Sequence, residues 1–398
     1  MHEKEDRNSH RLRRGRGGGV YVSQLFGARK FDEISPAFNC MYCLIAVMAA
    51  AAGLLAIIVA EPLMRALDTP ENIFDDAVLY FRVYCAALPG LGVYSSGSAG
   101  LRSIGDAKAP LYFLIFSAVL NVALNILFVV AFKMGVAGVA WATLIAQYLS
   151  AILVLLRTKT TKLCKIEVNF KTLNLNPKTV KIILKLGIPS ALQNAVNSIG
   201  SVLCQRYINS FGSDGIAAAS TVMRLDGFVM MPAQSIGMAM SVFFGQNLAA
   251  KKLDRLNKGT VFGMSLAMAF SVVLSVVLYI FAAPALRLFT SDAGVIALGV
   301  EMLHVLCWWY WLMAGFQVFS GVLRGAGDTM SVMVISLIGT VLRVPLTYLM
   351  AIRPAEPKFT NIFWAMNICN LVMLGVSFAY YLTGRWKKKA VVTIDSKK

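Results

Sequence analysis

The sequence repeats a short motif at a constant spacing of 222 positions. Leu-Arg-x-x-Gly-Asp occurs at 101–106 and again at 323–328. Two weaker matches keep the same spacing: Glu-Pro-Leu-Met-Arg at 61–65 with Ala-Pro-Ala-Leu-Arg at 283–287, and Gly-Ala-Arg-Lys-Phe-Asp at 27–32 with Ala-Ala-Lys-Lys-Leu-Asp at 249–254. Because all the matches keep one register, they indicate two copies of a single helical unit.

The composition places these copies in a membrane. Apolar residues make up 58% of the chain and charged residues only 15%, whereas soluble domains have about 45–50% and about 25%. The apolar runs are long enough to cross a hydrocarbon core of about 30 Å as helices, which satisfy their own backbone groups in lipid. We predict an all-α polytopic membrane protein with ten crossings, at 39–60, 75–100, 109–132, 134–156, 181–210, 216–248, 259–283, 295–322, 329–351 and 360–384.

The net charge of +18 is distributed unevenly along the chain. Lysine and arginine gather in alternate connections, at 157–185, 251–258 and 385–389, while the connections between these are acidic or nearly uncharged. This alternation follows the positive-inside rule and predicts a multi-pass protein of the cell membrane with both termini in the cytoplasm. Membrane lipid is therefore the expected partner of the basic loops, and nucleic acid is not.

The sequence contains no cluster of residues typical of catalysis or metal binding. Cys40 and Cys43 have the spacing of a metal or redox pair, but neither a second pair nor a histidine cluster accompanies them, so packing is their expected role. The chain has three histidines, and its helices carry no paired acids or metal-spaced ligands. We therefore expect neither enzyme activity nor a metal or cofactor.

The first copy of the repeat lacks its beginning. The second copy opens with two predicted helices before its landmark at 249–254, whereas the first has 26 residues ahead of Gly27. The counterpart of the apolar stretch 223–244 is 1–22, which is too charged to enter lipid. This comparison predicts that the first helix and most of the second are missing. A late start in the gene prediction and a natural short form both remain open.

These landmarks divide the chain into two predicted lobes joined by a linker. We expect a disordered polar leader at 1–19, an incomplete N-terminal lobe at 20–157, a cytoplasmic linker at 158–178, a C-terminal lobe at 179–386 and a cytoplasmic tail at 387–398. The linker is polar and lysine-rich and contains Pro177, a composition typical of a flexible connection.

Six stretches carry a family pattern: Val22–Arg29, Gly100–Asp106, Leu186–Pro189, Phe244–Leu248, Gly321–Thr329 and Arg343–Pro345. Through them, residues 20 to about 386 resemble the multidrug and toxic compound extrusion (MATE) family. Gly245-Gln246-Asn247 is rather specific to that family, and Gln24 occupies the matching place in the first copy. The resemblance implies a twelve-helix fold in two six-helix lobes. It also implies export of organic cations or other amphipathic compounds, driven by inward flow of H⁺ or Na⁺.

Asp226 is the carboxylate that we place nearest the membrane centre, inside the crossing predicted at 216–248. Ionisable side chains are costly in a membrane and tend to mark pathways or partners, so Asp226, with Arg224 beside it, is the candidate for cation coupling. The alternative is a structural ion pair with an arginine of another helix, Arg206 or Arg343. Both interpretations remain open.

The chain departs from the family pattern at its acidic positions. Family members often place an acid on the first helix, which is absent here, or a glutamate shortly after the Gly-x-Pro of the seventh helix, where this chain has Gln193. Gln193, Asn194 and Asn197 form a polar stripe on that helix. Such a stripe suits the lining of a wet cavity and equally suits hydrogen bonding between helices.

The crossing predicted at 295–322 contributes further candidates for a substrate cavity, namely Glu301, Trp308, Trp311 and Gln317. Aromatic faces with one acid suit a flat lipophilic cation. An interfacial aromatic belt is the competing interpretation. The tryptophans lie 13 to 16 positions into the helix, deeper than a belt usually reaches, which favours cavity lining.

The two repeated turns carry Arg102 and Asp106 in the first copy and Arg324 and Asp328 in the second. Their glycines permit tight turns on the cytoplasmic side, and their charged residues suit the pinning of neighbouring loops. We interpret both turns as structural or gating elements.

Three functions follow as hypotheses. The first is a monomeric, ion-coupled antiporter that exports organic cations by alternating access. The second is a flippase for lipid-linked sugars, from the same superfamily. A flippase would favour a strongly cationic cavity, whereas the helices here carry few arginines and also the acids Asp226 and Glu301. The third is an inactive, truncated remnant.

Overall fold

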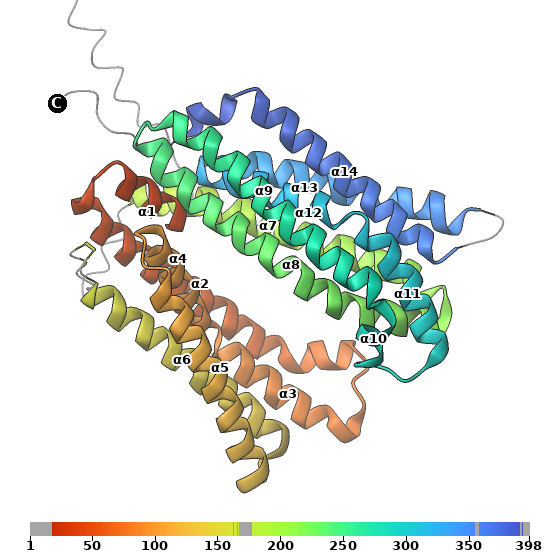
Figure 1. The fold of residues 1–398 in the computed structure, drawn as a ribbon. Coiled ribbons are helices and arrows are strands. Elements are labelled where there is room, and N and C mark those ends of the chain that lie inside the picture. Colours follow the sequence, from red (N-terminus) through yellow and green to blue (C-terminus); the bar gives the residue numbers. More distant parts are fainter. Residues whose placement is uncertain are drawn as a thin grey trace, which may run out of the picture. The chain divides into compact units, whose positions relative to one another are not determined.

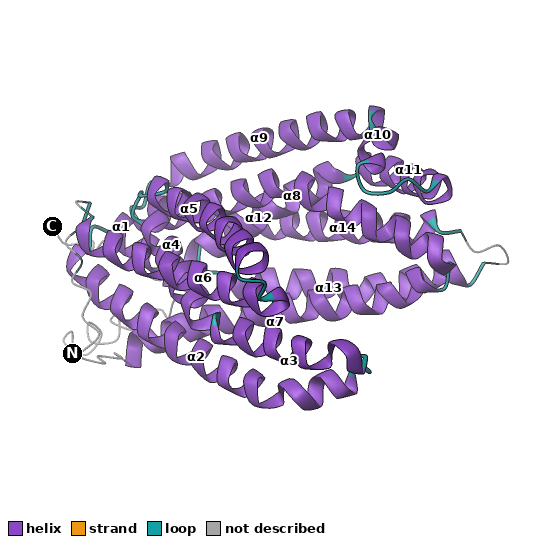
Figure 2. Ribbon diagram, turned by 90° about the horizontal axis from the view of Figure 1, so that it is seen from below, coloured by secondary structure: helices purple, strands orange, loops and turns teal. Residues whose placement is uncertain are grey.

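The computed structural model describes residues 18–161, 163, 164, 166, 177–354, 358–390 and 392, with the backbone alone at Lys178. These residues form helices joined by short loops, and no strand occurs among them (Figure 2). Most of the leader expected at 1–19 and of the linker expected at 158–178 lies outside the described residues. Gly18 and Gly19 already belong to a helix, and the last helix of the first lobe continues to Thr160.

The chain forms two compact units, Gly17–Leu184 and a second that contains Lys185–Lys398. The first unit contains α1 (Gly18–Gly27), α2 (Phe31–Ala66), α3 (Glu71–Ala86), α4 (Leu88–Ser103), α5 (Lys108–Asn125) and α6 (Gly135–Thr160) (Figure 1). The second contains most of α7 (Pro177–Asn209), then α8 (Gly212–Ala249), α9 (Leu253–Ile280), α10 (Ala282–Arg287), α11 (Ala293–Cys307), α12 (Tyr310–Gly325), α13 (Thr329–Thr347) and α14 (Thr360–Leu382). The boundary falls inside α7, beyond the linker expected at 158–178.

Eight helical stretches in the described residues are long and apolar enough to cross a membrane, and the bent pair α11–α12 brings the number to nine. The one expected crossing that is missing from this set is 181–210, which corresponds to α7. Lys185, Gln193 and Asn194 lower the hydropathy of α7, which explains the difference. The all-α polytopic fold predicted from composition is confirmed, with eight or nine apolar spans instead of ten.

The two units repeat the same backbone irregularities at the spacing found in the sequence. After α1 and after α8, Arg29 and Lys251 take positive φ values of 59° and 56°. Both α5 and α13 continue into π-helical turns, which begin at Ile126 and Tyr348. The breaks between α3 and α4 and between α11 and α12 also correspond, and the second pair is bent by 51°. The pseudo-symmetric pair of helical bundles is therefore confirmed.

The repeated motif forms the same turn in both units. Gly105 and Gly327 have φ values of 99° and 89°, where an L side chain would be strained. In each turn the backbone N–H of the motif aspartate donates to the carbonyl of the motif leucine, at 2.9 Å in the first unit and 2.8 Å in the second. Each turn thus connects two spans with little freedom, α4 to α5 and α12 to α13.

The second unit is built around a close contact between α8 and α12. A Cβ atom at Gly321 would overlap the backbone of Gly237, and one at Gly237 would lie 2.7 Å from the carbonyl oxygen of Gln317. Small residues allow helices to approach in lipid, where packing replaces the hydrophobic effect as the driving force. Phe244 and Trp386 belong to the same core cluster and are fully buried, with ring centroids 5.6 Å apart.

In the first unit, α5 is the element with the largest apolar exposure. None of the residues in its most apolar stretch is buried. It packs mainly against α6, while Leu111, Phe116 and Val119 are 54%, 49% and 65% exposed. A surface of this kind is stable only when lipid covers it.

Candidate functional site

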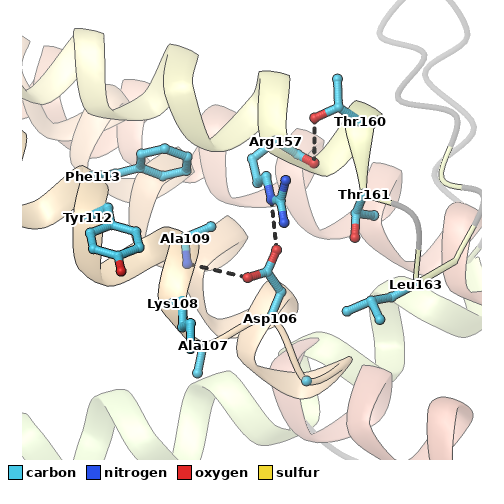
Figure 3. Close-up of a pocket in the computed structure, with 11 residues that line it drawn as sticks. Asp106, Ala107, Lys108, Ala109, Tyr112, Phe113, Arg157, Thr160, Thr161 and Leu163 are labelled. Atoms are coloured by element: carbon cyan, nitrogen blue, oxygen red, sulfur yellow. Dashed lines mark hydrogen bonds and ion pairs between the residues drawn. The ribbon is translucent and has the colours of Figure 1, made fainter.

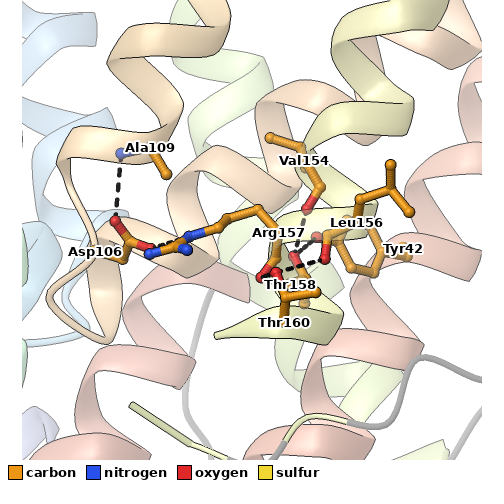
Figure 4. A network of polar contacts seen from close by, with 8 residues as sticks. All are labelled: Tyr42, Asp106, Ala109, Val154, Leu156, Arg157, Thr158 and Thr160. Carbon is orange, nitrogen blue, oxygen red and sulfur yellow. Dashed lines mark hydrogen bonds and ion pairs between the residues drawn. The ribbon is translucent and has the colours of Figure 1, made fainter. Parts of the chain in front are cut away.

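In the first unit, Asp106 connects the repeated turn to the end of α6 (Figure 4). Its carboxylate accepts a hydrogen bond from the backbone N–H of Ala109 at 3.3 Å, in the first turn of α5, and forms an ion pair with Arg157 Nε at 2.7 Å. One residue farther along α6, the hydroxyls of Thr158 and Tyr42 lie 2.7 Å apart and join α6 to α2. These contacts fasten α2, α5, α6 and the α4–α5 turn to one another at one end of the unit.

Asp328 holds the corresponding position in the second unit, where its side chain is fully buried. It accepts hydrogen bonds from the backbone N–H of Ser331 at 3.4 Å and from the hydroxyl of Tyr380, and Lys389 Nζ lies 3.9 Å away. The turn is thereby tied to α13, to α14 and to the 3₁₀ turn Arg385–Lys389. Both motif aspartates thus bind the last helix of their unit, or the segment directly after it.

Gln193 and Arg324 lie together in the second unit. Gln193 is buried on α7, donates through Nε2 to the hydroxyl of Ser336 at 2.7 Å, and accepts at Oε1 from Arg324 Nη2 at 3.1 Å. One turn farther along α7, Asn197 accepts from the hydroxyl of Thr340 at 3.2 Å. These amides connect α7 with α12 and α13, which favours the hydrogen-bonding interpretation of the polar stripe.

Asp226 faces the break between α11 and α12. Its side chain on α8 is half-buried and interacts with the hydroxyl of Tyr310, the first residue of α12. Tyr310 is only 3% exposed, and its hydroxyl has no hydrogen-bond partner of standard geometry among the described residues. The structure therefore holds a carboxylate beside an incompletely satisfied phenol, at a bend of 51°.

The arginine partners considered for Asp226 are not found. The polar neighbour of its carboxylate is Tyr310, and the described residues form no ion pair between Asp226 and Arg206. Arg343 of α13 instead interacts with the thiols of Cys204 on α7 and Cys369 on α14.

The remaining candidates are dispersed over their units. Two of them, Arg102 and Gln317, are half-buried. The others are exposed: Arg224, Asn194, Glu301, Trp308 and Trp311. The indole N–H of Trp311 donates to the carbonyl oxygen of Trp308 at 3.0 Å, and Trp308 packs edge-on against Tyr279. In the described part of the chain, no hydrogen bond or ring contact joins either tryptophan to Asp226.

Sequence reasoning did not identify the partners Arg157, Tyr380, Lys389, Ser336 and Tyr310. A signal existed for two of them. Arg157 lies at the end of the last helix of the first unit, and Lys389 follows the last helix of the second. Pairing each motif aspartate with a cation at the end of its own lobe would have found both.

Comparison with known proteins extends these observations. The family model MatE matches residues 15–127 and 189–349, which lie in both copies of the repeat. The probable multidrug resistance protein YpnP of Bacillus subtilis (strain 168) is 29% identical over 378 residues, covering 94% of this chain and 82% of the relative. The probable multidrug resistance protein YoeA of the same strain is 25% identical over 387 residues, covering 96% and 83%.

A crystal structure of MATE in a bent conformation has the same fold, with a TM-score of 0.87 at 18% identity, covering 94% of this chain and 84% of that one. The likeness to this structure agrees with the helical fold described above. Since the family model matches more than half of the sequence, this chain belongs to the MatE family of membrane transporters.

Proposed function

We propose that the chain is a secondary antiporter that exports organic cations by alternating access, in exchange for H⁺ or Na⁺. The observation that carries the proposal is Asp226, a carboxylate half-buried inside a membrane-spanning helix beside the hydroxyl of Tyr310. A charge in that environment is costly unless it is paired, so binding of a cation or proton changes its energy strongly. The two relatives described as probable multidrug resistance proteins support the substrate class.

In this proposal Asp226 couples ion binding to a movement of helices. The charged carboxylate attracts the hydroxyl of Tyr310, and a proton on Asp226 weakens that attraction. A sodium ion would instead use oxygen atoms of both side chains. Because Tyr310 opens α12 directly after the break, each change at this contact alters the relative energy of different bends between α11 and α12. An ion shifts a conformational equilibrium only through such a differential interaction.

Glu301, Trp308, Trp311 and Gln317 are the residues that we propose contact the substrate, since aromatic faces and acids attract flat cations. A flippase for lipid-linked sugars is the alternative within the family. It would require cationic side chains around its anionic substrate, whereas the ionisable groups of α8 and α11 include Asp226 and Glu301. An inactive form is the third outcome that an experiment must distinguish.

Ethidium accumulation in an efflux-deficient host tests this function. Cells that express the chain should accumulate less dye than cells with an empty vector. Asp226→Asn should abolish the ion-driven part of this difference, because an amide takes up no proton. Asp214→Asn is the matched control, since it makes the same chemical change in the exposed first turn of the same helix and should leave efflux unchanged.

Each component of the proposal has its own contrary result. Unchanged dye accumulation, with the full-length chain present in the membrane, would argue for the flippase or for an inactive form. Full ion-driven efflux by Asp226→Asn would remove Asp226 from coupling. Collapsing the pH gradient and the Na⁺ gradient separately identifies the coupling ion.

A further inference from the structure

The first unit contains a cavity of about 850 Å³ beside Asp106 (Figure 3). It lies between the α4–α5 turn, the beginning of α5 and the end of α6. Its lining combines the polar residues Lys108, Arg157 and Thr161 with the apolar residues Tyr112, Phe113 and Leu163. The volume is within the range of small-molecule sites, about 300–1,000 Å³.

Polar groups of the lining lack a hydrogen-bond partner among the described residues. Thr161 is only 7% exposed, and its hydroxyl has no partner in the described part of the chain, which is costly for a buried polar group. Arg157 uses Nε to bind Asp106, so both terminal nitrogens of its guanidinium remain without a partner in the described part of the chain. Lys108 forms no ion pair there either.

These groups select for a negatively charged ligand with several oxygen atoms. Two cations face the cavity, and the one carboxylate in its wall already accepts from Ala109 and Arg157. A phosphate group matches this set, because guanidinium, ammonium and hydroxyl groups all donate to phosphate oxygens.

Tyr112 and Phe113 of the lining connect the cavity to the exposed face of α5. Tyr112 is 64% exposed, and the apolar stretch of α5 has no buried residue. One span begins at Lys108 and another ends at Thr160, so the cavity lies where membrane-spanning helices end and lipid headgroups begin. The lysine-rich connection that follows α6 assigns this end to the cytoplasmic leaflet, which carries anionic lipids.

The second unit closes the equivalent position with its own side chains. Asp328 is fully buried against Tyr380 and Lys389, and Trp386 beyond α14 is fully buried as well. In the first unit, the described chain supplies no such cover, and the cavity remains beside the same turn.

We propose that this cavity binds the headgroup phosphate of an anionic phospholipid. Arg157, Lys108 and Thr161 hold the phosphate oxygens, and the acyl chains lie along the exposed face of α5. The lipid adds to the Asp106–Arg157 ion pair in fastening the α4–α5 turn to α6. This site is separate from Asp226 and does not depend on the transported substrate.

Native mass spectrometry of the full-length protein in detergent tests the lipid site. We expect the protein to retain one phosphatidylglycerol in preference to phosphatidylcholine with the same acyl chains. Lys108→Gln should weaken this retention about fivefold, because it removes one cation near the anionic headgroup. Thr161→Val, which keeps the shape of the side chain and removes its hydroxyl, should also weaken it. Neither change breaks the Asp106–Arg157 ion pair.

Lys258→Gln is the matched control, since Lys258 is an exposed lysine of the second unit and its loss should leave retention unchanged. Equal retention of phosphatidylcholine would overturn the proposal, as would unchanged retention in both Lys108→Gln and Thr161→Val. Displacement of the lipid by an equal concentration of inorganic phosphate would show that the cavity takes a soluble anion, which also overturns it.

Discussion

Asp106 and Asp328 occupy the same turn of the repeat but contribute differently to their units. Each accepts a hydrogen bond from the first turn of the next helix. Asp106 pairs with Arg157, whose side chain is 43% exposed, so solvent weakens the attraction. Asp328 is fully buried and also satisfies the hydroxyl of Tyr380. Removing its side chain would break the contacts with Ser331, Tyr380 and Lys389 at once.

Alanine substitution of the two aspartates should therefore have unequal effects. Each change removes a hydrogen bond to the first turn of the following helix, which contributes about 0.5–1.5 kcal/mol. Asp328→Ala additionally removes the hydrogen bond from Tyr380 to a fully buried carboxylate, and hydrogen bonds to charged groups contribute about 1.5–3 kcal/mol. Thermal unfolding of the purified variants in detergent should give a lower Tm for Asp328→Ala than for Asp106→Ala. Equal Tm values would show that burial of Asp328 adds no stability, and Tyr380→Phe measures the hydroxyl's share.

At the scale of elements, the contact between α8 and α12 is the closest helix pairing in the second unit. It depends on Gly237 and Gly321, where there is no room for a methyl group. The contact fixes the position of α12, whose first residue is Tyr310. The site at Asp226 therefore depends on glycines that lie well away from it in the sequence. Separating α8 from α12 would move the carboxylate and the phenol apart.

Gly321→Ala should destabilise the protein, because its Cβ atom would overlap the backbone of Gly237, which has no flexible side chain to move aside. We expect a loss of about 1–3 kcal/mol and a clearly lower Tm. Gly375→Ala is the control, since a Cβ atom there would meet no heavy atom within 4 Å. It should be neutral or slightly stabilising, because alanine has the higher helix propensity. Equal Tm values for both variants would contradict the close contact.

For the whole molecule, the membrane is part of the folded structure. Both units expose large apolar side chains, for example Val130 at 68% in the first and Phe262 at 70% in the second. Lipid must cover such surfaces, and the alternation of basic and acidic connections gives the orientation that we propose, with both termini in the cytoplasm of the cell.

Cysteine labelling in intact cells tests this orientation. A membrane-impermeant maleimide should label Ser291→Cys, in an exposed connection that we place outside the cell. It should label Lys258→Cys only after the membrane has been permeabilised. The seven native cysteines are all buried, so they give little background. Labelling of Lys258→Cys in intact cells would reverse the predicted topology.

The sequence by itself determined that the helices lie in lipid, that the helical unit is duplicated, and where equivalent turns occur. Apolar runs reveal helices in lipid because each helix satisfies its own backbone. Gly105 and Gly327 could be placed in equivalent turns because the hydrogen bonds of such a turn span only a few residues. Even α7 was found as a helix, although its polar residues keep it outside the set of apolar spans.

Only the tertiary structure decided which side chains meet. Asp106 and Arg157 are 51 positions apart, and Gln193 and Ser336 are 143 apart, so neither pairing follows from local spacing. Asp226 lies beside Tyr310 because of the rotation of α8 and the break before α12, whereas Arg343, one of the two arginines considered as its partner, interacts with Cys204. Contacts of this kind depend on how whole helices pack, and each packing sums many weak interactions over both faces, which no single motif encodes.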